Sequence, residues 1–296
     1  MDAMNTRRIL FFLLAFSFGM LPGVSLAGDI VFLSHKRLPV VMELARQVGG
    51  LLQRKTSVEV ITDSGYSVAE AANAVVVVGP QALALWKPGK TPAVAVFVSR
   101  AQVTDSLESL HTALYLEPPV VRQVALARSL IGDELPVGVL AQSRSRLAVS
   151  GLDAEMIRKY AVKPYFLDDY GNINRALVDL LDECYVLVGQ YDTELYSAKN
   201  IKNILITAYR QNRPLIGPSS AYIRAGSLAT TYSDLDDVAL RLSEILTAGL
   251  TRGQWLSPGY NPHFKVRFNE QVARSLNLTL PDAEQLVEAL KRREVQ

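Results

Sequence analysis

The sequence is poor in the residues on which covalent and metal chemistry usually depends. It contains one cysteine, Cys184, and three histidines among 296 residues. A single cysteine excludes an internal disulfide framework. Because Cys184 lies far from the N-terminus, we also expect no lipid attached to a processed N-terminus. Cys184 opens the apolar run CYVLVG, which predicts a small buried hydrophobe and not a reactive thiol.

Motifs for catalysis are also missing. The chain has no Gly-x-Ser-x-Gly elbow, no His-Glu-x-x-His motif and no Cys/His spacing typical of a metal site. Gly89-Lys90-Thr91 has the tail of a phosphate-binding loop, but Ala84 stands where its first glycine is required. We therefore expect no enzyme, no catalytic residue, no metal and no cofactor. An exported α/β hydrolase would need a nucleophile and a base that this search does not find.

Runs of like charge are absent from the chain. Its formal net charge is +2 and its charged residues are dispersed, so the sequence indicates neither nucleic-acid nor membrane-surface binding. The nearest approach to a basic cluster is Lys291-Arg292-Arg293. It ends an amphipathic helix, where cations complement the helix dipole. We expect no nucleic-acid partner.

The N-terminus has the pattern of a cleavable secretory signal over residues 1–27. Two arginines precede an apolar run over residues 9–24, and small residues occupy the two positions that a signal peptidase reads before Gly28. An uncleaved membrane anchor is the alternative. We favour the signal because serine, glycine and proline residues interrupt the run before it reaches a span of about 20 residues. The predicted location is the periplasm.

Apolar strand-like runs alternate with helical segments along the rest of the chain, which is the rhythm of parallel sheets wrapped by helices. The run over residues 74–78 has no polar alternation, as expected of a strand covered on both faces. The predicted strands of a first series span residues 30–33, 58–61, 74–78, 93–98 and 113–116. Those of a second series span residues 137–140, 162–167, 185–188, 215–216 and 264–268.

A stiff break at Glu117-Pro118-Pro119 separates the two series. Proline favours a helix start, and apolar residues recurring at three and four predict a helix over residues 120–131. The simplest fold is α/β, with two lobes that are each a parallel sheet flanked by helices, and a cleft between them. The predicted units are the signal peptide at 1–27, an N-terminal lobe at 28–117, a C-terminal lobe at 118–232, and crossover segments and closing helices shared between the lobes at 233–296.

Polar residues follow the predicted strands where each strand ends. Residues 204–234 show this clearly, because a helical pattern ends before Pro214, a short strand reaches Gly217, and Ser219 follows. Ligands bind at that edge of open parallel sheets, so these residues are the predicted lining of a ligand cleft. They are Ser34, His35, Gly79, Ser99, Gln142, Ser143, Tyr191, Asp192, Gly217 and Ser219.

Several of these residues have a second interpretation. Tyr191 and Asp192 would offer an aromatic face for the body of a ligand and an anion for its ammonium group. Asp192 equally fits a cap for the helix predicted near Glu194. Ser34 and His35 would offer hydrogen-bond donors, or form a polar loop before the next helix.

Two charged residues outside that set also leave alternatives open. Arg100, after the strand at 93–98, would clamp a ligand carboxylate or form a surface salt bridge. Asp168, after the strand at 162–167, would reach the cleft or cap the segment that follows Gly171.

Three groups of motifs resemble those of a known family. The first is Tyr209-Arg210, Pro214-Leu-Ile-Gly217, Ser219, Tyr222, Ala225-Gly226, Leu228-Ala229 and Tyr232-Ser233. The second is Phe268-Asn269, Val272-Ala273-Arg274, Leu276 and Leu278-Thr279-Leu280-Pro281. The third is Tyr115-Leu116, Arg122-Gln123 and Pro136-Val-Gly-Val-Leu140. In these segments the chain looks like the TrpX-like ABC-transporter substrate-binding proteins.

The resemblance implies a type I periplasmic binding protein that closes two lobes over a small ligand, often an aromatic amino acid in characterised relatives. Its implied activity is capture of the ligand and delivery to a membrane ABC permease, and we expect a monomer. A periplasmic sensory subunit that docks on a membrane sensor protein without transport is the alternative, since it would use the same closing lobes. The turn at Gln142 and the Asp192-Thr193 pair depart from the family's usual residues, so an altered ligand stays open.

Overall fold

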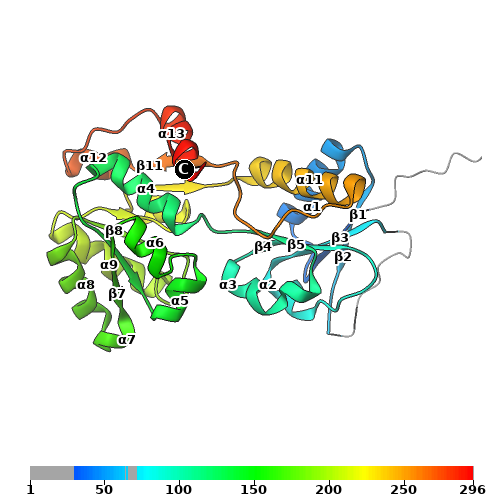
Figure 1. Cartoon of the computed structure of the whole chain (residues 1–296), viewed down its shortest axis with the longest axis horizontal. Coiled ribbons are helices and arrows are strands. Elements are labelled where there is room, and N and C mark those ends of the chain that lie inside the picture. Colours follow the sequence, from blue (N-terminus) through cyan, green and yellow to red (C-terminus); the bar gives the residue numbers. More distant parts are fainter. Residues whose placement is uncertain (1–29, 64, 66–71, 296) are drawn as a thin grey trace, which may run out of the picture.

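The computed structural model describes residues 30–63, 65 and 72–295 (Figure 1). They form two α/β lobes that lie side by side along the long axis of the molecule. The predicted signal peptide at 1–27 lies outside the described residues. Within the described part of the chain, no helix combines the length and the apolar character needed to cross a membrane.

The first lobe is built on a five-stranded sheet with the order β2-β1-β3-β4-β5. Every strand is parallel to its neighbours. The central strand β3 is apolar and buried along its whole length, as its run of valines predicts. The strands are β1 (Ile30–Ser34), β2 (Thr56–Val60), β3 (Ala74–Val78), β4 (Ala93–Val98) and β5 (Thr112–Tyr115).

Helices cover both faces of this sheet, because successive side chains of a buried strand enter opposite cores. Phe32 and Val76 pack on one side, whereas Leu33 and Val77 pack on the other. The helices of the first side are α1 (Pro39–Leu52) and α11 (Leu235–Arg252). Those of the second side are α2 (Gly79–Leu85) and α3 (Arg100–Val103), followed by the 3-10 turn η1 (Thr104–Ser109).

The second lobe is built on a six-stranded sheet with the order β11-β10-β9-β8-β6-β7. Its strands are parallel except for β11, which runs antiparallel to β10 at one edge. The strands are β6 (Val137–Ala141), β7 (Val162–Phe166), β8 (Val186–Val188), β9 (Leu215–Ile216), β10 (Ala229–Tyr232) and β11 (Lys265–Phe268).

Two cores flank this second sheet. One includes α4 (Val120–Ile131), α5 (Arg144–Val149), α6 (Ala154–Lys159), α12 (Glu270–Ser275) and α13 (Ala283–Val295). The other includes α7 (Leu167–Tyr170), α8 (Ile173–Glu183), α9 (Ala198–Arg210) and α10 (Ala221–Ala225). The helix predicted over residues 120–131 is α4, and it buries the apolar positions that repeat at three and four.

The chain passes between the lobes at residues 116–119, 233–234 and 253–264. The third crossing runs beside β5, where Tyr115 donates its backbone N–H to the carbonyl of Gly259 at 2.9 Å and Gly259 donates to the carbonyl of Ala113 at 3.0 Å. As a result, residues far apart in the sequence meet between the lobes. Helix α11 packs on the first lobe, whereas β11, α12 and α13 complete the second.

The two-lobed α/β architecture predicted from the sequence is therefore confirmed. The expected strands at 74–78, 93–98 and 215–216 have the observed bounds. Others differ by one or two residues at an end, for example β8, which begins at Val186 and not at Tyr185. Strand ends of this kind depend on single hydrogen bonds, which a hydrophobic pattern does not specify.

Candidate functional site

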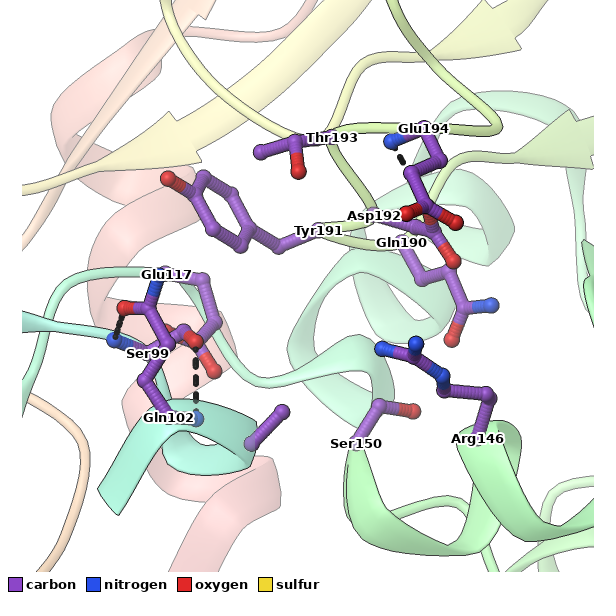
Figure 2. A pocket seen from close by; sticks show the side chains of 11 residues that line it. Ser99, Gln102, Glu117, Arg146, Ser150, Gln190, Tyr191, Asp192, Thr193 and Glu194 are labelled. Carbon is purple, nitrogen blue, oxygen red and sulfur yellow. Dashed lines mark hydrogen bonds between the residues drawn. The ribbon is translucent and has the colours of Figure 1, made fainter. Parts of the chain in front are cut away.

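A small pocket lies between the two lobes, with a volume of about 190 Å³. Figure 2 shows its side chains entering from both lobes. The first lobe and the first crossing contribute Ser99, Ala101, Gln102 and Glu117. The second lobe contributes Arg146, Ser150, Gln190, Tyr191, Asp192, Thr193 and Glu194. The lining is mostly polar, so the pocket suits a polar ligand.

The exit of β4 supplies the first-lobe rim of the pocket. Ser99 begins α3 with a capping box, in which its hydroxyl accepts from the backbone N–H of Gln102 at 3.2 Å. The Gln102 side chain accepts in return from the backbone N–H of Ser99 at 2.8 Å. Such a box satisfies two backbone donors of a helix start. Both side chains are thereby held in place at the rim.

Glu117 is the buried acid of the pocket. It lies in the first crossing, its residue is 9% exposed, and its Oε1 accepts from the backbone N–H of Arg100 at 2.8 Å. Its second carboxylate oxygen, Oε2, is buried and has no hydrogen-bond partner among the described residues. Burial raises the pKa of Glu117 above its ordinary value, and the bond from Arg100 opposes that rise.

Gln190 is the buried amide of the pocket. It lies two residues after the end of β8, at the carboxyl edge of the second sheet, and it is 2% exposed. Its side-chain nitrogen Nε2 is buried and meets no acceptor in the described part of the chain. A buried polar group without a partner costs about 1–3 kcal/mol. Two such atoms in one pocket indicate a place where a ligand completes the hydrogen bonds.

The segment after Gln190 contains Asp192, for which the sequence left two alternatives. Asp192 accepts the backbone N–H groups of Glu194 and Leu195 at 3.0 and 2.8 Å. Its Oδ1 therefore caps the turn that follows, and Asp192 also lines the pocket. The Tyr191 ring lines the pocket, and its pKa is raised by burial and further by the negative charge of Glu117.

Arg146 brings the positive charge to the pocket. It projects from α5, and Figure 2 shows its guanidinium pointing into the space between Ser150 and Gln190. Its backbone N–H is bonded by the Ser143 hydroxyl, which caps α5. Within the described chain, its guanidinium forms no ion pair and no hydrogen bond, so it is free to meet an acceptor or an anionic group of a ligand.

Three of the ten predicted site residues, Ser99, Tyr191 and Asp192, line this pocket. The other seven do not. Ser34 is buried at the end of β1, and the partly exposed His35 follows it. Gly79 opens α2 with a φ of 83°, a backbone conformation that favours glycine.

The remaining predicted residues have local partners in the second lobe. The side-chain amide of Gln142 donates to Asp168 at 3.0 Å. Asp168 therefore has a hydrogen-bond partner within the second lobe. Ser143 caps α5, as described above. Gly217 follows β9 in a tight place, since an added Cβ would lie 2.7 Å from the Ser227 hydroxyl. Ser219 lies in the loop before α10, where its carbonyl accepts from a backbone N–H.

Glu117, Gln190 and Arg146 are the pocket residues that the sequence reasoning missed. Gln190 carries a signal that would have found it, because it occupies the strand exit immediately before Tyr191. Glu117 comes directly after the predicted strand at 113–116, but its neighbours Pro118 and Pro119 made it look like part of a linker. Arg146 lies inside α5, so a search for polar residues at the ends of strands does not find it.

Neither a protein-family model nor a curated protein sequence matches the chain. Solved structures do match over most of its length. One is an ABC domain in complex with L-Trp from Streptococcus pneumonia, with 15% identity, a TM-score of 0.53 and coverage of 88% of this chain and 97% of the other. A second is the ligand-free, open structure of a substrate-binding protein with adhesive properties from Clostridium difficile, with 13% identity, a TM-score of 0.62 and coverage of 86% and 96%.

A third match is a conserved domain protein from Vibrio cholerae, with 15% identity, a TM-score of 0.54 and coverage of 88% and 98%. The chain has the type I periplasmic binding protein fold. At these identities the likeness establishes the fold alone, so the ligand and the partner must be argued from the pocket. The pocket between the lobes is the place to look for a ligand, because ligand sites occur preferentially at interfaces between domains.

Proposed function

We propose that the protein is a periplasmic solute-binding protein that captures a small polar ligand between its lobes and delivers it to a membrane ABC permease. One observation carries the proposal. Glu117 Oε2 and Gln190 Nε2 are both buried, both lack a partner within the described residues, and both line the same pocket. Glu117 lies in the first crossing and is bonded to Arg100 of the first lobe, whereas Gln190 belongs to the second lobe. A single ligand that satisfies both would hold the lobes together.

The pocket supports binding more readily than chemistry. Its charged groups are a buried carboxyl at Glu117, a capping carboxylate at Asp192, and the exposed Arg146 and Glu194. A nucleophile activated by a base within hydrogen-bond reach, as covalent catalysis requires, does not occur among its lining residues. The neighbouring hydroxyls of Ser99 and Ser150 instead bond to backbone atoms.

Ligand capture is tested by thermal unfolding of the purified protein with a panel of free amino acids, biogenic amines, carboxylic acids and small sugars. A ligand present at a hundred times its dissociation constant should stabilise the protein by about 2.7 kcal/mol. We expect at least one compound of the panel to raise the unfolding temperature, and Gln190→Leu to remove that shift. No shift with any compound would contradict the proposal.

Delivery to a permease is a separate step with its own readout. Cells that lack the protein should lose uptake of the compound that binds, at concentrations near its dissociation constant. Unchanged uptake together with a lost transcriptional or enzymatic response to the same compound would instead support the sensory alternative.

A further inference from the structure

We propose that Arg100 latches the two lobes together beside the pocket, through Tyr260 and Gly151, and positions Glu117 from the same place. Arg100 begins α3 in the first lobe, Tyr260 lies in the third crossing, and Gly151 lies in the second lobe between α5 and α6. The latch consists of Arg100, Tyr260, Ser150 and Gly151. It goes beyond solute capture, because its effect on the lobes does not depend on which solute binds.

The two lobes touch where α3 meets α5 (Figure 1). The guanidinium of Arg100 lies over Gly151 there, since a Cβ built on this glycine would lie 2.7 Å from Nη1 of Arg100 and 3.3 Å from the Tyr260 hydroxyl. Gly151 has a φ of 89°, in the region that favours glycine. A side chain at this position would displace the guanidinium, which is the movable end of a long side chain. The close approach of the lobes therefore depends on a glycine.

Tyr260 completes the connection to the second lobe. Its hydroxyl donates to the backbone carbonyl of Ser150 at 3.0 Å, and the Arg100 side chain is hydrogen-bonded to the same hydroxyl. An arginine only donates, whereas a hydroxyl both donates and accepts. A line of hydrogen bonds therefore runs from the first lobe through the third crossing to the second lobe. The Tyr260 ring is held against Tyr115 in an edge-to-face pair, with ring centroids 5.1 Å apart.

Arg100 also connects the latch to the buried acid of the pocket. Its backbone N–H donates to Oε1 of Glu117 at 2.8 Å. Burial raises the pKa of Glu117, and both this bond and the charge of the Arg100 guanidinium oppose that rise. Arg100 is thus a positioning residue for Glu117. Because Glu117 and Ser150 both line the pocket, the latch lies at the pocket wall.

Contacts that span two lobes act on the equilibrium between their open and closed arrangements. The latch forms only while α3 lies against α5, so it favours the arrangement in which the walls of the pocket are close together. One net hydrogen bond in a protein shifts a two-state equilibrium by about two- to tenfold. A solute that binds the closed arrangement gains apparent affinity in proportion to the fraction of protein already closed. The latch therefore prepares the pocket without touching the solute.

The test measures the distance between the lobes of the purified protein by double electron–electron resonance, with no added solute. Spin labels at Ala84→Cys in α2 and Val178→Cys in α8 report on the two lobes, because both positions are exposed. Cys184 is buried. Labelling of the protein without the two new cysteines checks that Cys184 stays unmodified.

Tyr260→Phe removes the hydroxyl but keeps the ring and its contact with Tyr115. We expect it to raise the ratio of open to closed arrangements by about two- to tenfold, seen as a shift of the label distances to larger values, and Arg100→Met to do the same. The double variant should go no further than either single variant, because both break one connection. Tyr232→Phe is the matched control: its hydroxyl accepts from Arg267 at 2.9 Å, but both residues belong to the second lobe.

Two glycines provide a second matched pair. Gly151→Ala and Gly132→Ala both place alanine at a positive φ, of 89° and 97°, so both variants carry a similar backbone cost. Only Gly151→Ala adds a methyl group where the guanidinium lies, whereas no atom of the described residues lies within 4 Å of a Cβ at Gly132. We expect Gly151→Ala to separate the labels and Gly132→Ala to leave their distance unchanged. If Gly151→Ala does not fold, Tyr260→Phe and Arg100→Met decide.

The outcomes separate the latch from the proposed function. Unchanged label distances in Tyr260→Phe and Arg100→Met would overturn the latch, whether or not the protein binds a solute. Separated lobes in both variants of a protein that binds no compound of the panel would support the latch and contradict solute capture. An equal separation in Tyr232→Phe or Gly132→Ala would show that a general loss of stability moves the lobes, which would overturn the inference.

Discussion

At the scale of single residues, two buried glutamines differ in how many hydrogen bonds their side-chain amides make. Gln123 in α4 makes four hydrogen bonds: its amide nitrogen donates to Gly217 and Thr230, both at 2.9 Å. Its amide oxygen accepts from the backbone N–H and the hydroxyl of Thr231 at 3.0 and 3.2 Å. Gln190 is equally buried, yet its nitrogen has no partner among the described residues.

The two glutamines should therefore respond in opposite ways to replacement by leucine. Gln123→Leu leaves the backbone N–H of Thr231 without its acceptor, and we expect the free energy of unfolding to fall by about 2–3 kcal/mol. Gln190→Leu removes a donor that has no partner, so the ligand-free protein should be equally stable or more stable. Denaturant unfolding of both variants measures this. A large loss of stability in Gln190→Leu would contradict the role assigned to Gln190.

At the scale of elements, the start of α11 connects the second and third crossings. Asp234 and Asp237 form a capping box at its first turn, with bonds of 3.1 and 3.0 Å. Lys265, the first residue of β11, pairs with Asp234 and lies 3.2 Å from Asp237. Because α11 belongs to the first lobe and β11 to the second, this cluster joins the two lobes beside the crossings.

The cluster makes a prediction about pH. Burial alone would raise the pKa of Asp234, but the bonds from Lys265 and Asp237 lower it overall. A carboxyl with a lowered pKa stabilises the folded state above its unfolded pKa of about 3.9, and that stabilisation is lost as the pH falls through the folded pKa. Both partners are about half exposed, so we expect a modest effect of about 0.5–1 kcal/mol.

Lys265→Met should therefore lower the free energy of unfolding by this amount at pH 7, and the difference from the unaltered protein should vanish in acid. Urea unfolding across pH 2–7 measures it. Arg274→Met is a suitable control, because Arg274 pairs with Glu270 only on the exposed face of α12, at 3.5 Å. A constant difference at all pH values would show that Lys265 acts through packing and not through its charge.

Elements were also the scale at which the sequence was most informative. The valines of β3 and the apolar spacing of α4 are local signals, and both elements have the predicted bounds. The candidate site depends on contacts that no local pattern contains. Glu117 is buried between the lobes, where the third crossing brings Tyr260 beside it from far along the chain. From the sequence alone, Glu117-Pro118-Pro119 was therefore interpreted as a linker.

At the scale of the whole molecule, the proposed function depends on the position of the pocket between the two lobes. Within the described residues, three crossings join the lobes. Two buried protein atoms that lack hydrogen-bond partners there, Glu117 Oε2 and Gln190 Nε2, line the pocket between the lobes. A ligand bound to only one lobe would not change their relative position. A ligand that contacts Glu117 and Gln190 together would favour the closed arrangement, because it binds that arrangement more tightly than the open one.

The most direct test of this account is a crystal structure of the protein with the compound that gives the largest thermal shift. We predict that the compound lies in the pocket between the lobes, with polar groups within hydrogen-bond distance of both Glu117 Oε2 and Gln190 Nε2. A compound bound elsewhere, or bound in this pocket without contact to either atom, would contradict the account.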